Sequence, residues 1–266
     1  MLFCKSATTF NCLFGEKMLE VLNNFVPRTS YFVFTLPILT LTFATLLAVE
    51  SPALPKIQMT TQQLVASGLQ LPLMEAFYTI QGEGRFSGHA AYFIRLGGCD
   101  VGCVWCDVKE SWEAGKWPVL PIEQLVDDAL SYPGRLVVIT GGEPLLYDLG
   151  PLTQLLKSKG FSTHLETSGA HPYSGDFDWV CFSPKKFKKP DPSIYEVANE
   201  LKVVVYHPSD LAFAEEHATQ VGLGCELRLQ PEWSKASERL PELIDFIKSN
   251  PNWKISLQTH KFMDIP

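Results

Sequence analysis

The sequence predicts an α/β fold, an incomplete (truncated) TIM-type barrel with a parallel sheet and fewer helices than strands. Short β-branched runs alternate with amphipathic stretches of helical spacing, which indicates a parallel sheet joined by right-handed crossovers. Two connections, residues 167–178 and 184–200, are too short for a full helix, and the second is rich in Lys and Pro. The barrel therefore lacks some of the helices of eight complete βα units.

Seven segments are predicted to be strands, because each has four to six residues rich in β-branched or aliphatic side chains between Gly, Pro, Ser or Asp. They are residues 92–96, 136–140, 163–166, 179–182, 201–206, 226–229 and 254–257. Four stretches are predicted to be helices from the spacing of their apolar residues. They are residues 121–131, 149–159, 210–220 and 237–249.

Composition narrows the class of protein. The chain has 266 residues, of which 46% are hydrophobic and 19% charged, so it is neither disordered nor fibrous. Its net charge of −7 and scattered basic residues argue against binding to duplex nucleic acid, but allow a small acidic ligand. Seven cysteines are too few for a disulfide scaffold, and three lie close together, which indicates a metal site in a reducing, cytoplasmic compartment.

Residues 1–58 are predicted to be an extension outside the functional domain, which spans residues 59–266. Residues 31–49 carry no charge and are long enough to cross a bilayer, although Pro37 interrupts them. They could be an anchor or uncleaved signal, a targeting segment that is removed, or an upstream extension with Met59 as the natural start. We favour the last, because the basic residues before this stretch would place an anchored domain outside the cell.

Polar and glycine-rich segments follow six of the predicted strands. They are residues 97–99, 140–144, 167–169, 183–185, 230–233 and 258–261. Because the C-terminal ends of parallel strands share one rim of the sheet, we expect these segments to converge on a single site.

Three cysteines, Cys99, Cys103 and Cys106, lie in the first of these loops with the spacing C-x3-C-x2-C. Thiolates presented by one loop suit zinc or an iron–sulfur cluster. A zinc knuckle usually has a fourth Cys or His nearby, and the ten residues after Cys106 contain none. A cluster held by three cysteines leaves one iron open to a substrate or cofactor. Cys181 and Cys225 stand alone and are expected to be small buried hydrophobes.

This cysteine spacing, with Trp105 before the third cysteine and Gly-Gly-Glu-Pro at residues 141–144, resembles the radical S-adenosylmethionine (SAM) superfamily. The resemblance implies a [4Fe–4S] cluster whose open iron binds SAM, and a 5′-deoxyadenosyl radical that abstracts hydrogen from the substrate. Gly141 and Gly142 would let the backbone approach the methionyl group of SAM. Glu143 would fix the loop or pair with a cationic amine.

From about residue 74 to its C-terminus, the chain resembles the 7-carboxy-7-deazaguanine synthase family. The matching motifs are residues 75–84, Gly88, and residues 92–99, 166–169, 183–185, 200–202, 229–231 and 258–261. The resemblance implies a carbon–nitrogen lyase that converts 6-carboxy-5,6,7,8-tetrahydropterin to 7-carboxy-7-deazaguanine with loss of ammonia, in queuosine biosynthesis. It also implies recycled SAM, Mg²⁺, a homodimer, and an electron donor such as a flavodoxin or ferredoxin, with no direct contact to nucleic acid.

The resemblance also implies roles for individual residues. Those that would contact the pterin are Ile80, Gln81, Gly82, Arg95, Thr140 and Pro266. Those that would hold SAM are Trp105, Cys106, Asp107, Gly142, Ser168, Ser183, Pro184, Lys185 and Gln230. The catalytic residues would be the metal ligands Cys99, Cys103 and Cys106, with Arg95, Glu83 and His260. Gln81 and Glu83 would recognise the amide and amino edge of the pterin. Arg95 would bind the substrate carboxylate, the alternative being a strand-end salt bridge.

One position departs from the pattern of this family. The family usually has Asp-Thr after the third cysteine, and the threonine hydroxyl binds magnesium; here the pair is Asp107-Val108. Valine offers no oxygen to a hard cation. We therefore expect weaker dependence on Mg²⁺, with the ion held by the substrate carboxylate and water, or by Ser111.

Two alternatives stay open at this point. The first is a radical SAM activase, which would generate a glycyl radical on a partner protein. The second is a redox or structural metal-binding module without catalysis. The activase shares the cysteine spacing but gives no reason for the Ile-Gln-Gly-Glu-Gly sequence of residues 80–84.

Overall fold

The computed structural model describes residues 59–266. The uncharged stretch at residues 31–49 and the alternatives considered for residues 1–58 lie outside this range. Over the range that is described, none of the helices combines the length and the apolar character needed to cross a bilayer.

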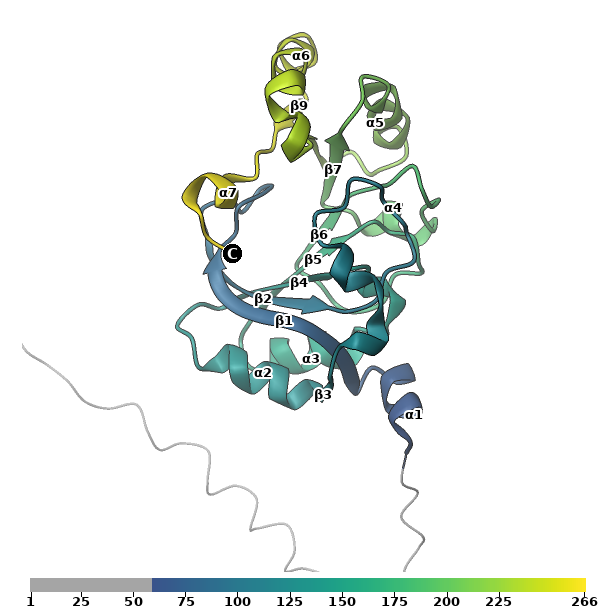
Figure 1. Ribbon diagram of the computed structural model, residues 1–266, viewed down its shortest axis with the longest axis vertical. Coiled ribbons are helices and arrows are strands. Elements are labelled where there is room, and N and C mark those ends of the chain that lie inside the picture. The colour runs from purple at the N-terminus through teal and green to yellow at the C-terminus, as the bar shows by residue number, and fades with distance from the viewer. Residues whose placement is uncertain (1–58) are drawn as a thin grey trace, which may run out of the picture. The chain divides into compact units, whose positions relative to one another are not determined.

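Nine strands of this range form one curved sheet in the order β3-β1-β2-β4-β5-β6-β7-β8-β9 (Figure 1). They are β1 (Gln70–Ile80), β2 (Ala90–Leu96), β3 (Val119–Pro121), β4 (Leu136–Gly141), β5 (Ser162–Thr167), β6 (Trp179–Phe182), β7 (Glu200–Val205), β8 (Glu226–Pro231) and β9 (Trp253–Ile255). From β2 through β4 to β9 the neighbours are parallel, which confirms the predicted parallel sheet.

Seven α-helices lie in the same range, fewer than the strands. They are α1 (Thr61–Ala66), α2 (Ile122–Leu130), α3 (Gly150–Ser158), α4 (Ser193–Val197), α5 (Asp210–Ala218), α6 (Ala236–Ser249) and α7 (Thr259–Met263). The four predicted helices are confirmed, with ends within two residues of those expected. Of the two short connections, the first has no helix and the second has only α4, of five residues.

Helices α2, α3, α5 and α6 pack on the outer side of the sheet. Helices α2 and α3 pack against each other, with α2 also against β1 and α3 against β5. Helix α5 packs on β7, and α6 packs on β8 and β9 (Figure 1). Four short 3₁₀ turns lie in the loops, at Lys109–Trp112, Ala114–Lys116, Pro144–Leu146 and Trp233–Lys235.

The longest strand, β1, is one that the sequence pattern does not predict. Its apolar run is interrupted by Pro72 and Glu75, and its pairing with β2 shifts register between Leu73 and Glu75. Its first residues pair with β3 and its later residues with β2, in both cases antiparallel. One end of the sheet is therefore antiparallel, and Ile80 at the end of β1 pairs with Ala90 at the start of β2.

The central strands have two different faces. Leu165, Leu201 and Leu229 are fully buried in the core beneath the helices. Because successive side chains of a strand point to opposite faces, their neighbours Glu166, Lys202 and Gln230 face the inside of the curved sheet. The core that positions the site is thus apolar on one side of each strand and polar on the other.

Truncation of Leu165 tests this core. We expect Leu165→Ala to lower the free energy of unfolding by about 2–5 kcal/mol, because its side chain is fully enclosed and the cavity left behind cannot collapse completely. The matched control is Leu223→Ala, whose side chain is fully exposed and whose loss should cost less than about 0.5 kcal/mol. Urea unfolding followed by circular dichroism measures both, and equal values would contradict the assignment of the core.

Candidate active site

A cavity of about 280 Å³ lies at the C-terminal ends of the strands. All six polar and glycine-rich segments that follow predicted strands contribute residues to its wall, which confirms their expected convergence. The loop after β1 and the C-terminal segment complete the wall. The polar inner faces of β5, β7 and β8 form part of it through Glu166, Lys202 and Gln230.

The structure brings almost all of the predicted site residues to this one cavity. Those that line it are Ile80, Gln81, Gly82, Glu83, Arg95, Cys99, Cys103, Trp105, Cys106, Asp107, Thr140, Gly142, Ser168, Ser183, Lys185, Gln230, His260 and Pro266. Pro184 does not line it, because it is buried and faces an adjoining cavity of about 270 Å³ that shares Trp105 and Lys185. Pro184 can therefore contribute to the main cavity only by shaping its loop.

The three clustered cysteines all face this cavity, from the loop after β2. The pKa of the Cys103 thiol is raised to about 11, mainly by burial; the charge of Lys185 opposes this rise, and the neighbouring Cys106 and Cys99 add to it. A Cβ on Gly142 would lie 2.6 Å from the Cβ of Cys99 and 2.3 Å from the carbonyl oxygen of Gly98. The Gly-Gly-Glu-Pro loop can therefore pass close beneath the cysteine loop only without a side chain at this position.

This arrangement fits an iron–sulfur cluster better than a zinc knuckle. Among residues 59–266, no three His, Cys, Asp or Glu side chains converge on a point where they could share a single ion. Zinc requires its ligands around one centre, whereas each thiolate of a [4Fe–4S] cluster binds its own iron. Three separate thiols at one cavity wall therefore fit such a cluster, which Cys99, Cys103 and Cys106 would hold.

Glu143 has a structural role at the base of this site. The carboxylate is 1% exposed and accepts hydrogen bonds from the backbone N–H groups of Leu145 (3.0 Å) and Ser168 (2.9 Å). It also accepts hydrogen bonds from the hydroxyl groups of Thr167 and Ser168, each at 2.5 Å. Since both oxygens are engaged and Glu143 does not line the cavity, the expectation that it pairs with a cationic amine is wrong. It instead ties the loops after β4 and β5 together.

Lys185 places a cation beside the cysteine loop. Its ammonium donates to the carbonyl oxygen of Ser183 (2.8 Å) and to the hydroxyl oxygen of Ser183 (2.5 Å), and lies 5.6 Å from the ring centroid of Trp105. Burial lowers the pKa of Lys185, and the Cys103 thiol opposes this shift. Ser183, Lys185 and Trp105 thus form one wall with hydroxyl, cationic and aromatic groups.

Arg95 faces the cavity and is also part of a salt bridge. Its Nε donates to Glu75 Oε1 at 2.6 Å, so the alternative of a strand-end ion pair is present in the structure. This is the one hydrogen bond that its side chain makes within the described range. Arg95 can therefore be held by Glu75 through Nε and still offer its terminal nitrogens to a carboxylate.

The C-terminal segment forms another wall. The N–H and hydroxyl groups of Thr259 both donate to the carbonyl oxygen of Gly82 at 2.9 Å, which places α7 beside the end of β1 (Figure 1). Burial lowers the pKa of His260. Lys261 pairs with Asp107 at 3.1 Å and so joins this segment to the cysteine loop. Pro266 lines the cavity at the end of the chain.

Two groups near the expected magnesium site differ in their placement. Val108 lines the cavity, whereas Ser111 is buried and is not part of the cavity wall. The Ser111 hydroxyl donates to the carbonyl oxygen of Val108 at 2.7 Å. The expectation that Ser111 could bind the ion is therefore wrong for this arrangement.

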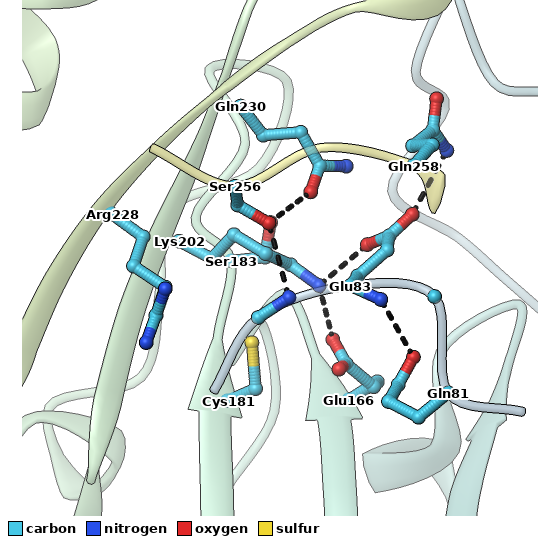
Figure 2. Close-up of polar contacts among 12 residues, drawn as sticks. Gln81, Glu83, Glu166, Cys181, Ser183, Lys202, Arg228, Gln230, Ser256 and Gln258 are labelled. Atoms are coloured by element: carbon cyan, nitrogen blue, oxygen red, sulfur yellow. Dashed lines mark hydrogen bonds and ion pairs between the residues drawn. The ribbon is translucent and has the colours of Figure 1, made fainter. Parts of the chain in front are cut away.

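Sequence reasoning assigned no role to Glu166 and Lys202, which lie on the cavity floor (Figure 2). The Lys202 ammonium lies 2.6 Å from Glu83 Oε2 and 2.9 Å from Glu166 Oε2. One signal in the sequence could have revealed them. Glu166 and Lys202 each follow a leucine of a buried strand, so they point to the opposite face, and a charged side chain there needs polar surroundings.

Replacement of Gly82 tests the docking of the C-terminal segment. A Cβ at this position would lie 2.3 Å from Nδ1 of His260 and 2.7 Å from its backbone nitrogen, so Gly82→Ala must displace α7. We expect faster amide hydrogen exchange across residues 259–266, with the sheet still protected. Gly115→Ala is the control, because its Cβ would meet no atom within 4 Å. Unchanged exchange in Gly82→Ala would contradict the described contact.

Comparison with known proteins gives the family of the chain. Residues 93–188 match the radical SAM superfamily. The 7-carboxy-7-deazaguanine synthase of Flavobacterium psychrophilum is 53% identical over 205 residues, which cover 77% of this chain and 97% of that protein. The Synechocystis protein of the same name is 47% identical over 195 residues, which cover 73% of this chain and 93% of that protein.

A solved structure agrees with the sequence comparison. The crystal structure of QueE from Escherichia coli matches with a TM-score of 0.66 and 37% identity, covering 73% of this chain and 96% of that one. This agreement supports the assignment of the fold as a partial barrel. Given these identities and the cysteine-lined cavity, the chain belongs to the 7-carboxy-7-deazaguanine synthase family of the radical SAM superfamily.

Proposed function

We propose that this chain converts 6-carboxy-5,6,7,8-tetrahydropterin to 7-carboxy-7-deazaguanine with loss of ammonia, as a radical SAM lyase of queuosine biosynthesis. The observation that carries the proposal is that one cavity is lined by the three cysteines, by Gln81 and Glu83, and by Arg95. A reductive cofactor site and a set of groups complementary to a carboxypterin thus meet in the same space. No observation favours the activase.

The cofactor side of the cavity would be built on the cysteine loop. Cys99, Cys103 and Cys106 would hold a [4Fe–4S] cluster, which with SAM supplies reductive cleavage of the sulfonium and abstraction of hydrogen from the substrate. The residues proposed to hold SAM are Trp105, Asp107, Gly142, Ser168, Ser183, Lys185 and Gln230. Of these, Ser183 and Lys185 offer the hydroxyl and the cation that suit its ribose and carboxylate.

The substrate side would be built on the end of β1 and on β2. Arg95, held by Glu75, would bind the substrate carboxylate through its terminal nitrogens. Gln81 and Glu83 would pair with the amide and amino edge of the pterin, and a different ring would leave these buried groups unpaired. The pocket would be completed by Ile80, Gly82, Thr140, His260 and Pro266. The docked C-terminal segment would exclude water from the reacting ring.

We further propose that residues 59–266 are the working domain, acting in the cytoplasm as a homodimer with a flavodoxin or ferredoxin as electron donor. Magnesium would be held by the substrate carboxylate and water, because Val108 has no oxygen in its side chain and Ser111 faces away. The product would reach tRNA only through later enzymes, which accords with the net charge of −7.

Anaerobic reconstitution tests the cofactor. We expect the wild-type protein to hold about four irons per chain and the spectrum of its reduced cluster in electron paramagnetic resonance to change when SAM is added. It should also release 7-carboxy-7-deazaguanine and ammonia from the pterin. Cys103→Ala should lose all of these properties, whereas Cys225→Ala, outside the cavity, should keep them. A wild-type cluster that does not respond to SAM would refute the proposal.

Val108 provides a test of magnesium binding. We expect the wild-type rate to depend weakly on Mg²⁺, and Val108→Thr to reach half-maximal rate at a lower Mg²⁺ concentration, since the new hydroxyl faces the cavity. Val108→Ala is the matched control, because it changes the side chain without adding oxygen. Activity measured against Mg²⁺ after chelation separates them, and identical curves for Val108→Thr and wild type would count against this account.

A further inference from the structure

Lys202 is an ammonium enclosed beneath the proposed substrate pocket. It lies on β7 between Leu201 and Val203, whose side chains belong to the apolar core. The side chain of Lys202 is only 4% exposed. A buried charge is stable only when it is paired and hydrogen-bonded, so the partners of Lys202 determine what it does.

The two partners come from separate parts of the fold. Glu83 lies in the connection from β1 to β2, and Glu166 lies on β5 (Figure 2). The ammonium is 2.6 Å from a carboxylate oxygen of Glu83 and 2.9 Å from one of Glu166. All three side chains line the cavity, so this bridge crosses the floor of the site.

Glu83 is held more firmly than Glu166. Its second oxygen accepts a hydrogen bond from Gln258 Nε2 at 2.9 Å, and its backbone N–H donates to Gln81 Oε1 at 3.1 Å. The next residue, Gly84, donates its N–H to the Ser256 hydroxyl at 3.0 Å. Contacts from β7 and from the C-terminal segment thus orient one carboxylate, the one proposed to recognise the pterin.

Other ionisable groups face this bridge from the surrounding elements. They are Cys181 on β6, Lys185 after β6, Glu200 at the start of β7, Arg228 on β8 and His260 on α7. Arg228 is 3.5 Å from Glu200, so that pair is largely self-compensated. Lys202 is therefore the cation in direct contact with Glu83.

We propose that Lys202 is a positioning residue for substrate recognition, which by bridging Glu83 and Glu166 keeps Glu83 a hydrogen-bond acceptor toward the donor edge of the pterin. The inference rests on the proposed function. The amide N–H and amino group of a pterin both donate hydrogen bonds, so the complementary carboxylate must carry no proton.

The electrostatics agree with this geometry. Burial by itself would raise the pKa of Glu83, but the charge of Lys202 and hydrogen bonds from Lys202, Gln258 and Gln230 lower it to about 2. Burial raises the pKa of Glu166, against the opposing charge of Lys202. Without the ammonium, two buried carboxylates would face each other and share a proton, as like charges at close range do.

The experiment is a calorimetric titration with pterin-6-carboxylic acid, whose aromatic C6 carries no hydrogen to abstract. Reconstituted full-length protein with SAM would be titrated between about pH 5.5 and 7, where the pterin amide keeps its proton. Wild-type affinity should be flat, because Glu83 is ionised throughout this range. In Lys202→Met, affinity should fall at least about tenfold at the acid end and recover as pH rises, because a carboxyl with a raised pKa loses its proton there.

A double-mutant cycle shows whether Lys202 acts through Glu83. In a Glu83→Gln background, Lys202→Met should change affinity by less than about twofold, because the group that it controls is gone. Lys254→Met is the matched control, since Lys254 pairs with Glu226 at 3.0 Å and is half exposed. It should bind as wild type does. Lys202→Arg, which keeps the charge, should retain the flat pH profile even if its affinity falls.

Three outcomes would overturn the inference. The first is wild-type affinity with a flat profile in Lys202→Met, and the second is an equal loss in both backgrounds. The third is an affinity of Lys202→Arg that depends on pH. This third measurement still tests the inference if Lys202→Met does not fold, or if its paramagnetic resonance spectrum no longer changes when SAM is added. If one of these outcomes is found but the wild-type protein still converts the substrate, the inference is wrong and the proposed function is unaffected. One that neither binds nor converts a carboxypterin refutes both.

Discussion

The site depends on the two-sided character of the parallel strands. Each central strand turns aliphatic side chains toward the helices and polar ones toward the inside of the curve, as Leu201 and Lys202 do on β7. In a complete barrel, side chains would fill this interior. Here the open curve and its polar inner face leave a cavity at the C-terminal rim. The buried charges are stable there because partners from other strands meet them.

Segments far apart in the chain close this cavity. Gly82 accepts two hydrogen bonds from Thr259, and Lys261 reaches Asp107 in the cysteine loop. Glu143 fixes the loops after β4 and β5 in the same way, through donors on both. The contacts of Glu143 are buried, and leaving such a bond unmade costs about 1–3 kcal/mol. The ion pair of Lys261 with Asp107 is exposed and holds its two segments more weakly.

These contacts also connect recognition with catalysis. The cysteine loop and the proposed pterin-binding residues line one small cavity, to whose wall the C-terminal segment also contributes. The ion pairs of Lys202 with Glu83 and Glu166 form part of the same wall. An error in the placement of one wall would thus affect both functions, as expected when reacting groups must be held within close limits.

Much of this protein is determined by local sequence. The spacing of apolar residues predicts the helices at residues 122–130 and 150–158. The cysteine spacing together with Gly-Gly-Glu-Pro indicates the cofactor. Both signals can be recognised because they depend only on residues that are close together in the chain. Strand β1 escapes such patterns, since Pro72 and Glu75 are accommodated by a bulge and by partners elsewhere. Only the tertiary structure decided that Glu143 is saturated, that Ser111 faces away, and that Lys202 bridges two carboxylates. Hydrogen bonds and ion pairs between distant segments have no periodicity along the sequence, and whether a charge is compensated depends on what folding brings beside it.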